Sequence, residues 1–200
     1  GFLALSLWGG AEAPAAQAEA PAAAPAVSAP AQSTAGAMTV SQVVNAVSDS
    51  VVAINTEVQT TNFFMQQVTG QAAGSGVIIS QDGYLLTNNH VIENATKVSV
   101  TLKNGESYDA ALVGTDPETD LAVIKIDAGG LQAAVIGSSS ALQVGDETIA
   151  IGNPLGELGG TVTNGIVSAL NREVTIDDRS MNLLQTNAAI NPGNSGGGLF

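Results

Sequence analysis

Short segments rich in β-branched and apolar residues, divided by turn sequences, fill the chain from residue 51 onward. Asp82-Gly83 and Asn104-Gly105 each lie between two such segments, and both dipeptides are strong signals of a β-hairpin. No long amphipathic helical pattern separates the segments, which argues against a parallel βαβ sheet. The first six predicted strands are residues 51–58, 77–80, 84–87, 98–102, 107–113 and 121–126. Six strands at this spacing predict an antiparallel barrel or sandwich.

A second set of strand-like segments follows the first. It comprises residues 133–136, 148–151, 162–170 and 183–186, and a further strand begins at Gly198. Residues 40–48 have apolar side chains at helical spacing and form the one plausible short helix. We therefore predict an all-β protein with two β-barrel-like units, residues 39–132 and residues 133–200, of which the second lacks its last strands.

The first 38 residues differ in composition from the rest. Residues 1–10 hold an apolar run too short to span a bilayer, which needs about 20 residues. We interpret them as the end of a truncated signal peptide or membrane anchor, and the alternative is a disordered terminus with stray apolar residues. Residues 11–38 are rich in alanine and interrupted by proline, which predicts a disordered linker. We expect the protein to be extracytoplasmic, at the cell surface, in the periplasm or secreted, with a possible membrane tether.

Composition excludes several classes of function. The chain has no cysteine, which excludes thiol nucleophiles, disulfides and Cys-ligated metal sites. Its net charge of −13 argues against nucleic acid as a partner. Its single histidine, His90, leaves no multi-histidine metal site, so we expect no metal and no cofactor. Any general-base histidine must be His90.

Residues 193–198 (GNSGGG) contain the strongest candidate for a nucleophile, Ser195. Flanking glycines allow a tight turn in which the N–H groups of Gly193 and Ser195 converge on one oxyanion. Residues 193–197 also fit the G-x-S-x-G nucleophile elbow of α/β-hydrolases, in which an acid and then a histidine follow the serine. Here His90 precedes Ser195, as in the chymotrypsin order. A Gly/Ser-rich loop without chemistry is the alternative.

Two aspartates are candidates for the acid that orients His90. Asp116 precedes Pro117 and fits the start of a turn. Asp120 opens the apolar segment 121–126, where it can be buried beside His90 and fix the imidazole tautomer. We favour Asp120.

Six segments, taken in order along the chain, resemble the HtrA/Deg family of trypsin-like, chymotrypsin-fold serine proteases. They are residues 74–79 (GSGVII), 87–92 (TNNHVI), 119–124 (TDLAVI), 149–156 (IAIGNPLG), 163–170 (TNGIVSAL) and 184–197 (LQTNAAINPGNSGG). The resemblance implies two antiparallel six-stranded β-barrels with the active site between them. It also implies Ser195 as nucleophile, His90 as general base, Asp120 as its orienting acid, and the N–H groups of Gly193 and Ser195 as the oxyanion hole.

The resemblance further implies a serine endopeptidase that degrades misfolded or damaged proteins outside the cytoplasm. Its members usually assemble as homo-trimers or larger oligomers, often with PDZ modules, and Arg172 matches an arginine of their regulatory loop. Residues 187–192 contain no acid, so we expect cleavage after a small apolar residue and not after Lys or Arg. The rival hypothesis is a non-catalytic, surface-tethered chaperone or scaffold that keeps the protease fold.

Some residues depart from the family pattern. Asn187 stands where many relatives carry Asp, and Gly198 where Ala or Pro is common, but neither change removes a catalytic group. The strands that would close the second barrel after Ser195 are missing from the sequence. We therefore expect a fragment, truncated at both ends, and expect residues 40–200 alone not to sustain casein cleavage.

Overall fold

The chain forms two antiparallel sheets in a computed structural model that describes residues 38–61, 66–153, 160–176, 179–191 and 194–200. The helical elements are α1 (Val40–Val47), η1 (Ser48–Ser50), α2 (Asn89–Ile92) and η2 (Ser139–Ala141). The strands are β1 (Val51–Thr61), β2 (Gln67–Ile78), β3 (Tyr84–Asn88), β4 (Ala95–Thr101), β5 (Ser107–Asp116), β6 (Leu121–Ile126), β7 (Glu147–Gly152), β8 (Thr161–Ile176), β9 (Arg179–Thr186) and β10 (Gly198–Leu199).

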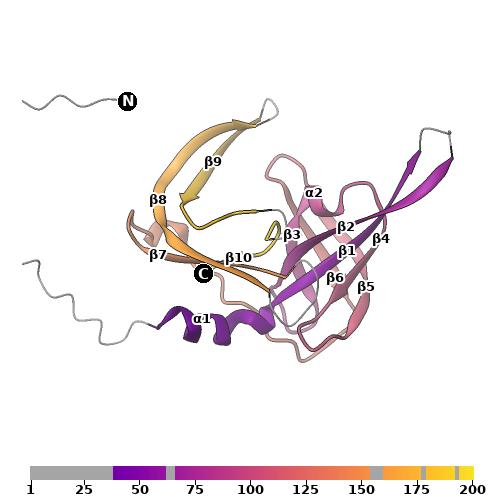
Figure 1. The fold of residues 1–200 in the computed structure, drawn as a ribbon, viewed down its shortest axis with the longest axis horizontal. Helices are drawn as coiled ribbons and strands as arrows, with labels where there is room; N and C mark the ends of the chain where they lie inside the picture. The colour runs from indigo at the N-terminus through magenta and orange to yellow at the C-terminus, as the bar shows by residue number, and fades with distance from the viewer. Residues whose placement is uncertain (1–37, 62–65, 154–159, 177–178, 192–193) are drawn as a thin grey trace, which may run out of the picture. The chain divides into compact units, whose positions relative to one another are not determined.

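The first six strands close into a barrel in the order β1-β2-β3-β6-β5-β4 (Figure 1). Each neighbouring pair is antiparallel, and β4 pairs with β1 to complete the ring. The prediction of an antiparallel barrel from six strands before residue 127 is therefore confirmed. The remaining strands form a four-stranded sheet in the order β10-β7-β8-β9. Within the described residues this second unit is a sheet, and no second closed barrel is seen.

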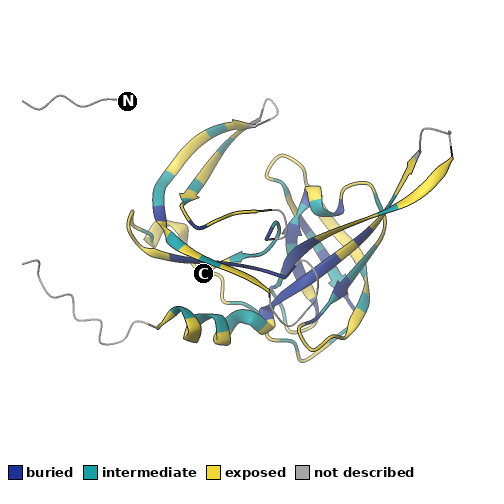
Figure 2. Cartoon of the chain, in the orientation of Figure 1, coloured by how far each residue is buried: buried dark blue, intermediate teal, exposed yellow. Residues whose placement is uncertain are grey.

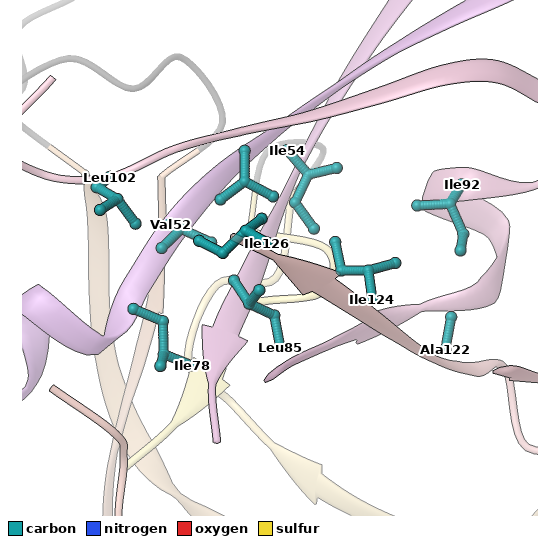
Figure 3. Close-up of a cluster of buried hydrophobic side chains, with 10 residues drawn as sticks. Val52, Ile54, Ile78, Leu85, Ile92, Leu102, Ala122, Ile124 and Ile126 are labelled. Carbon is teal, nitrogen blue, oxygen red and sulfur yellow. The ribbon is translucent and has the colours of Figure 1, made fainter. Parts of the chain in front are cut away.

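Alternation of side chains along the strands fills the barrel with aliphatic residues. In β6, Ala122, Ile124 and Ile126 are buried while the residues between them are half-buried. These side chains meet apolar residues from the other strands and from α2 in one cluster (Figure 3). The labelled members are Val52, Ile54, Ile78, Leu85, Ile92, Leu102, Ala122, Ile124 and Ile126.

Strand β1 is buried on both faces over its first four residues, which are dark blue in Figure 2. Val52 and Ile54 belong to the barrel core, whereas Val51 belongs to a second cluster with Ile149 and Ile151 of β7. Helix α1 packs its valines against this second cluster. One strand therefore contributes to both cores.

Helix α1 begins with a capping box. The hydroxyl of Thr39 accepts the Gln42 backbone N–H, and the Gln42 side chain accepts the Thr39 backbone N–H. The predicted helix over residues 40–48 is confirmed, with Ser48 as its C-cap residue. No helix within the described residues is long and apolar enough to cross a membrane.

The two Gly-containing dipeptides lie at the predicted hairpins β2–β3 and β4–β5. Gly83 has a φ of +99°, and a Cβ at this position would lie 2.4 Å from the Ile126 carbonyl oxygen. A side chain there would have to displace backbone, so this turn requires glycine.

Several strand predictions need correction. Strand β8 continues to Ile176, past the predicted end at 170, and β9 begins at Arg179, before the predicted start at 183. The predicted strand at residues 133–136 is wrong, because this segment forms no strand ladder: Ala134 donates one backbone hydrogen bond to the Ile78 carbonyl at the end of β2, and Val135 is 95% exposed. Strand β2 begins at Gln67, ten residues before the predicted start at 77. Its first part is rich in glycine, alanine and glutamine, but it pairs continuously with β1, and this pairing outweighs weak local β propensity.

Candidate active site

His90 lies where β3 leaves the barrel and enters the short helix α2. The helix is anchored because Ile92, two residues later, is buried in the barrel core. The His90 side chain is 55% exposed. The strand end and the buried Ile92 thus fix the backbone that carries an accessible imidazole.

Asp120 precedes β6 and adopts a left-handed backbone with a φ of +55°. This conformation is uncommon outside glycine, although aspartate tolerates it better than most residues. The Asp120 carbonyl oxygen accepts two hydrogen bonds, from the Asn89 backbone N–H at 3.0 Å and from the Asn88 side-chain amide at 2.9 Å. These two donors stabilise the unusual backbone at the base of α2.

Both carboxylate oxygens of Asp120 contact His90. One lies 2.7 Å from His90 Nδ1 and the other accepts the His90 backbone N–H at 2.9 Å. An ionised carboxylate can only accept, so this contact favours the tautomer with the proton on Nδ1 and a lone pair on Nε2. The Asp120 side chain is 34% exposed and therefore half-buried beside His90.

Asp116 has a separate role in the turn before Asp120. Its two carboxylate oxygens accept the Thr119 hydroxyl at 2.7 Å and the Glu118 backbone N–H at 3.0 Å. These hydrogen bonds, the one from the Thr119 hydroxyl above all, hold the pKa of Asp116 below its usual value. Of the two candidate acids, Asp120 is the one in contact with His90.

Ser195 lies in a turn that packs on the barrel. Its carbonyl oxygen accepts the backbone N–H of Ser75 in β2 at 2.8 Å. The next N–H, that of Gly196, donates to the Asn88 side-chain oxygen at 2.8 Å. Asn88 therefore contacts both the residue after the serine and Asp120.

Gly196 is required for this close approach. Its φ is +81°, and a Cβ would lie 2.2 Å from the Ser75 carbonyl oxygen and 2.4 Å from the Thr87 hydroxyl. Such distances leave no space for any side chain. The glycine after Ser195 thus allows the serine turn to reach β2 and β3.

Asn194 is buried and holds the turn just before the serine. Its side-chain oxygen accepts the Asn191 N–H at 3.1 Å, and its amide donates to the Ala189 carbonyl at 3.0 Å. Gly193, the second predicted oxyanion-hole donor, lies outside the described residues. The oxyanion hole stays a prediction.

Arg172, the candidate for a regulatory residue, lies on β8. Its guanidinium donates to the side-chain oxygen of Gln185 on the neighbouring strand β9. The predicted regulatory role of Arg172 stays a prediction.

Across the described part of the chain, no group of three or more His, Cys, Asp or Glu side chains could hold a metal ion.

Reasoning from the sequence missed three residues that connect the site. Asn88 is the first. The second is Ser75, whose hydroxyl accepts the Asn153 backbone N–H at 2.8 Å and whose carbonyl accepts the Thr87 hydroxyl at 2.7 Å. Asn153 is the third. All three lie inside segments quoted for their family resemblance, but nothing in their spacing shows which side chains face which loop.

Comparison with known proteins places this geometry in a family. Residues 74–200 match the family described as trypsin-like peptidase domain. The chain belongs to this family. The match starts in β2 and covers both His90 and Ser195, and it confirms that the resemblance noted in the sequence is to a family of peptidases.

Its relatives are DegP and HtrA serine proteases. The periplasmic serine endoprotease DegP of Escherichia coli K12 is 54% identical over 136 residues, which are 67% of this chain and 28% of DegP. The serine protease Do-like HtrB of Bacillus subtilis is 53% identical over 135 residues, 63% of this chain and 30% of HtrB. The chain thus spans less than a third of the length of either protein.

A solved structure gives the same result for the fold. The HtrA-type protease AlgW with decapeptide superposes with a TM-score of 0.69 at 40% identity. The superposition covers 81% of this chain and 55% of that chain. The fold around the candidate site is therefore that of a trypsin-like peptidase.

Proposed function

We propose that this protein is a serine endopeptidase in which Ser195, His90 and Asp120 form the catalytic triad. The observation that carries the proposal is the double contact of Asp120 with His90, at 2.7 Å to the ring and 2.9 Å to the backbone. This contact leaves Nε2 of the imidazole as the proton acceptor. Membership of the trypsin-like peptidase family and the chain order His90, Asp120, Ser195 support it.

The proposed reaction begins with transfer of the Ser195 hydroxyl proton to His90 Nε2. Ser195 Oγ forms a bond to the peptide carbonyl carbon, and the C=O π electrons move to oxygen. The N–H groups of Gly193 and Ser195 stabilise this oxyanion, and Asp120 stabilises the imidazolium. Collapse restores C=O and breaks the C–N bond, and Nε2 gives its proton to the leaving amine. Water then gives a proton to Nε2 and bonds to the acyl carbon. Collapse breaks the ester bond to Ser195 Oγ, which takes the proton back from Nε2, and the acyl group leaves as a carboxylic acid.

For the substrate we propose extended segments of misfolded or damaged proteins outside the cytoplasm. DegP, a close relative in sequence, is named a periplasmic endoprotease, and the AlgW structure holds a decapeptide. The described residues 187–191 carry no acid, which disfavours cleavage after Lys or Arg.

We also propose that the sheet β7–β10 belongs to a second barrel, so that the chain has domains at 39–132 and 133–200. We further propose that the protein assembles as a homo-oligomer.

A fluorophosphonate probe tests the proposed nucleophile in the full-length protein. The probe bonds to an activated serine, so wild type should be labelled and Ser195→Ala should not. With a protein substrate, Ser195→Ala should lower kcat by about 10⁴-fold or more. Ser107→Ala, which changes an exposed serine on β5, is the matched control and should keep the label. Absence of label from wild type would favour a binding protein such as a chaperone or scaffold.

A further inference from the structure

Asn88 joins the two loops that carry the proposed acid and nucleophile. It is the last residue of β3, half-buried, and two positions before His90. Its side-chain oxygen accepts the Gly196 N–H at 2.8 Å, and its side-chain nitrogen donates to the Asp120 carbonyl at 2.9 Å. A single planar carboxamide therefore bonds to the residue after Ser195 and to the residue that contacts His90.

The chemistry of this link requires an amide. The Gly196 N–H needs an acceptor and the Asp120 carbonyl needs a donor, and the carboxamide of Asn88 supplies both in one plane. A carboxylate of the same size keeps the acceptor but places an oxygen against the Asp120 carbonyl. An alanine supplies neither group. Both contacts depend on the identity of this side chain.

The contact also bears on a strained residue. Asp120 has a positive φ, and its carbonyl accepts only two described hydrogen bonds, from Asn88 and from the Asn89 backbone. Loss of the Asn88 bond removes one of the two restraints on a backbone that most residues avoid. Because both carboxylate oxygens of Asp120 contact His90, movement of this backbone moves the imidazole.

We propose that Asn88 is a positioning residue for the reaction, one that sets the Asp120–His90 pair and the Ser195 turn relative to each other. The inference rests on the proposed function for its effect on rate. The side chain of Asn88 bonds to backbone groups of Gly196 and Asp120, so its loss should slow bond formation at Ser195 with little change in binding.

The first test measures the rate of fluorophosphonate labelling in Asn88→Ala and Asn88→Asp, at several probe concentrations, in the full-length protein. Both variants should show a maximal labelling rate about 10–100-fold lower, as expected for small misplacement of reacting groups, with half-saturating probe concentration unchanged within about twofold. Asn55→Ala, which changes an exposed asparagine of the same barrel, is the matched control and should label like wild type. Thermal melts identify a variant that fails to fold. In that case the labelling rate of the other Asn88 variant tests the inference.

The second test does not depend on activity. Histidine labelled with ¹⁵N reports the Nδ1–H proton that bonds to Asp120, and the resonance is assigned by its loss in His90→Ala. It should shift or broaden in both Asn88 variants and stay unchanged in Asn55→Ala. If wild type takes no label but the resonance responds, the proposed function fails, whereas the inference that Asn88 sets the position of the Asp120–His90 pair stands. Folded variants with wild-type labelling and an unmoved resonance would overturn the inference.

Discussion

Asp120 combines an unusual backbone with a side chain that uses both oxygens on one histidine. The positive φ turns its carboxylate toward His90 while its carbonyl receives donors from Asn88 and Asn89. The charge of the carboxylate and its inability to donate are what select the imidazole tautomer. An uncharged side chain of the same shape would not select this tautomer.

Asp120→Asn should therefore preserve the fold and lower kcat by about 10³–10⁴-fold. The carboxamide can donate to Nδ1, which favours the tautomer with the proton on Nε2, where a base is needed. Casein cleavage by the full-length protein measures the effect. Asp109→Asn changes an exposed aspartate paired with Lys97 and should leave the rate unchanged. Equal rates for Asp120→Asn and wild type would exclude the orienting role of this carboxylate.

Gly196→Ala should destabilise the protein by about 3 kcal/mol or more, because strain at a positive φ adds to overlap with the Ser75 carbonyl. Gly105→Ala is the matched control: its φ is also positive, at +89°, but a Cβ there meets nothing within 4 Å. Strain alone should cost about 1–2 kcal/mol at Gly105. Urea unfolding of both variants measures the difference, and equal losses would argue against the tight packing of the serine turn.

At the scale of elements, the turn between β5 and β6 positions Asp120 beside His90. Asp116 ends β5 and accepts hydrogen bonds from Glu118 and Thr119 inside the turn. The turn is exposed, so these bonds, and not burial, determine its conformation. Its stability should accordingly depend on the charge of Asp116.

Because the pKa of Asp116 is lowered in the folded protein, stability should fall as the pH is lowered. The ordinary value of this pKa is 3.8, and a folded pKa below it means that the unfolded chain binds the proton more readily. The stabilisation is fully present above pH 3.8 and is lost as the pH falls through the lower folded pKa. Asp116→Asn should thus be less stable than wild type at pH 7, and the gap should close in strong acid. Urea midpoints between pH 2 and pH 7 measure it, and a gap independent of pH would contradict the assignment.

How far sequence predicts an element depends on whether its signals are local. The turns at Gly83 and Gly105 and the helix α1 carry local signals, and each lies where the sequence indicated. The early start of β2 depends on pairing with β1, and the segment 133–136 has β-branched residues but forms no strand ladder. The order of His90, Asp120 and Ser195 could be read from motifs, whereas the Asn88–Gly196 bond joins residues 108 positions apart and has no local signal.

At the scale of the whole molecule, Ser75 links the barrel with the four-stranded sheet. It is fully buried in β2, and its hydroxyl accepts the N–H of Asn153, the residue that follows β7. Its own N–H donates to the Ser195 carbonyl. One side chain and one backbone group thus connect the barrel, the sheet and the serine turn.

Ser75→Ala should lower the free energy of unfolding by about 1–3 kcal/mol, since it leaves the buried Asn153 N–H without its acceptor. Ser99→Ala, on the more exposed surface of β4, should change stability by less than about 0.5 kcal/mol. Urea unfolding monitored by circular dichroism compares the two. Equal values would mean that this hydrogen bond does not couple barrel and sheet.

The double burial of β1 has a consequence for how the molecule opens. Val52 and Ile54 lie in the barrel core, while Val51 of the same strand lies in the cluster with Ile149 and helix α1. Peeling this strand from either core would expose apolar surface in both. The amides of its first residues should therefore exchange with deuterium only when both cores open together, so that barrel and sheet form a single cooperative folding unit.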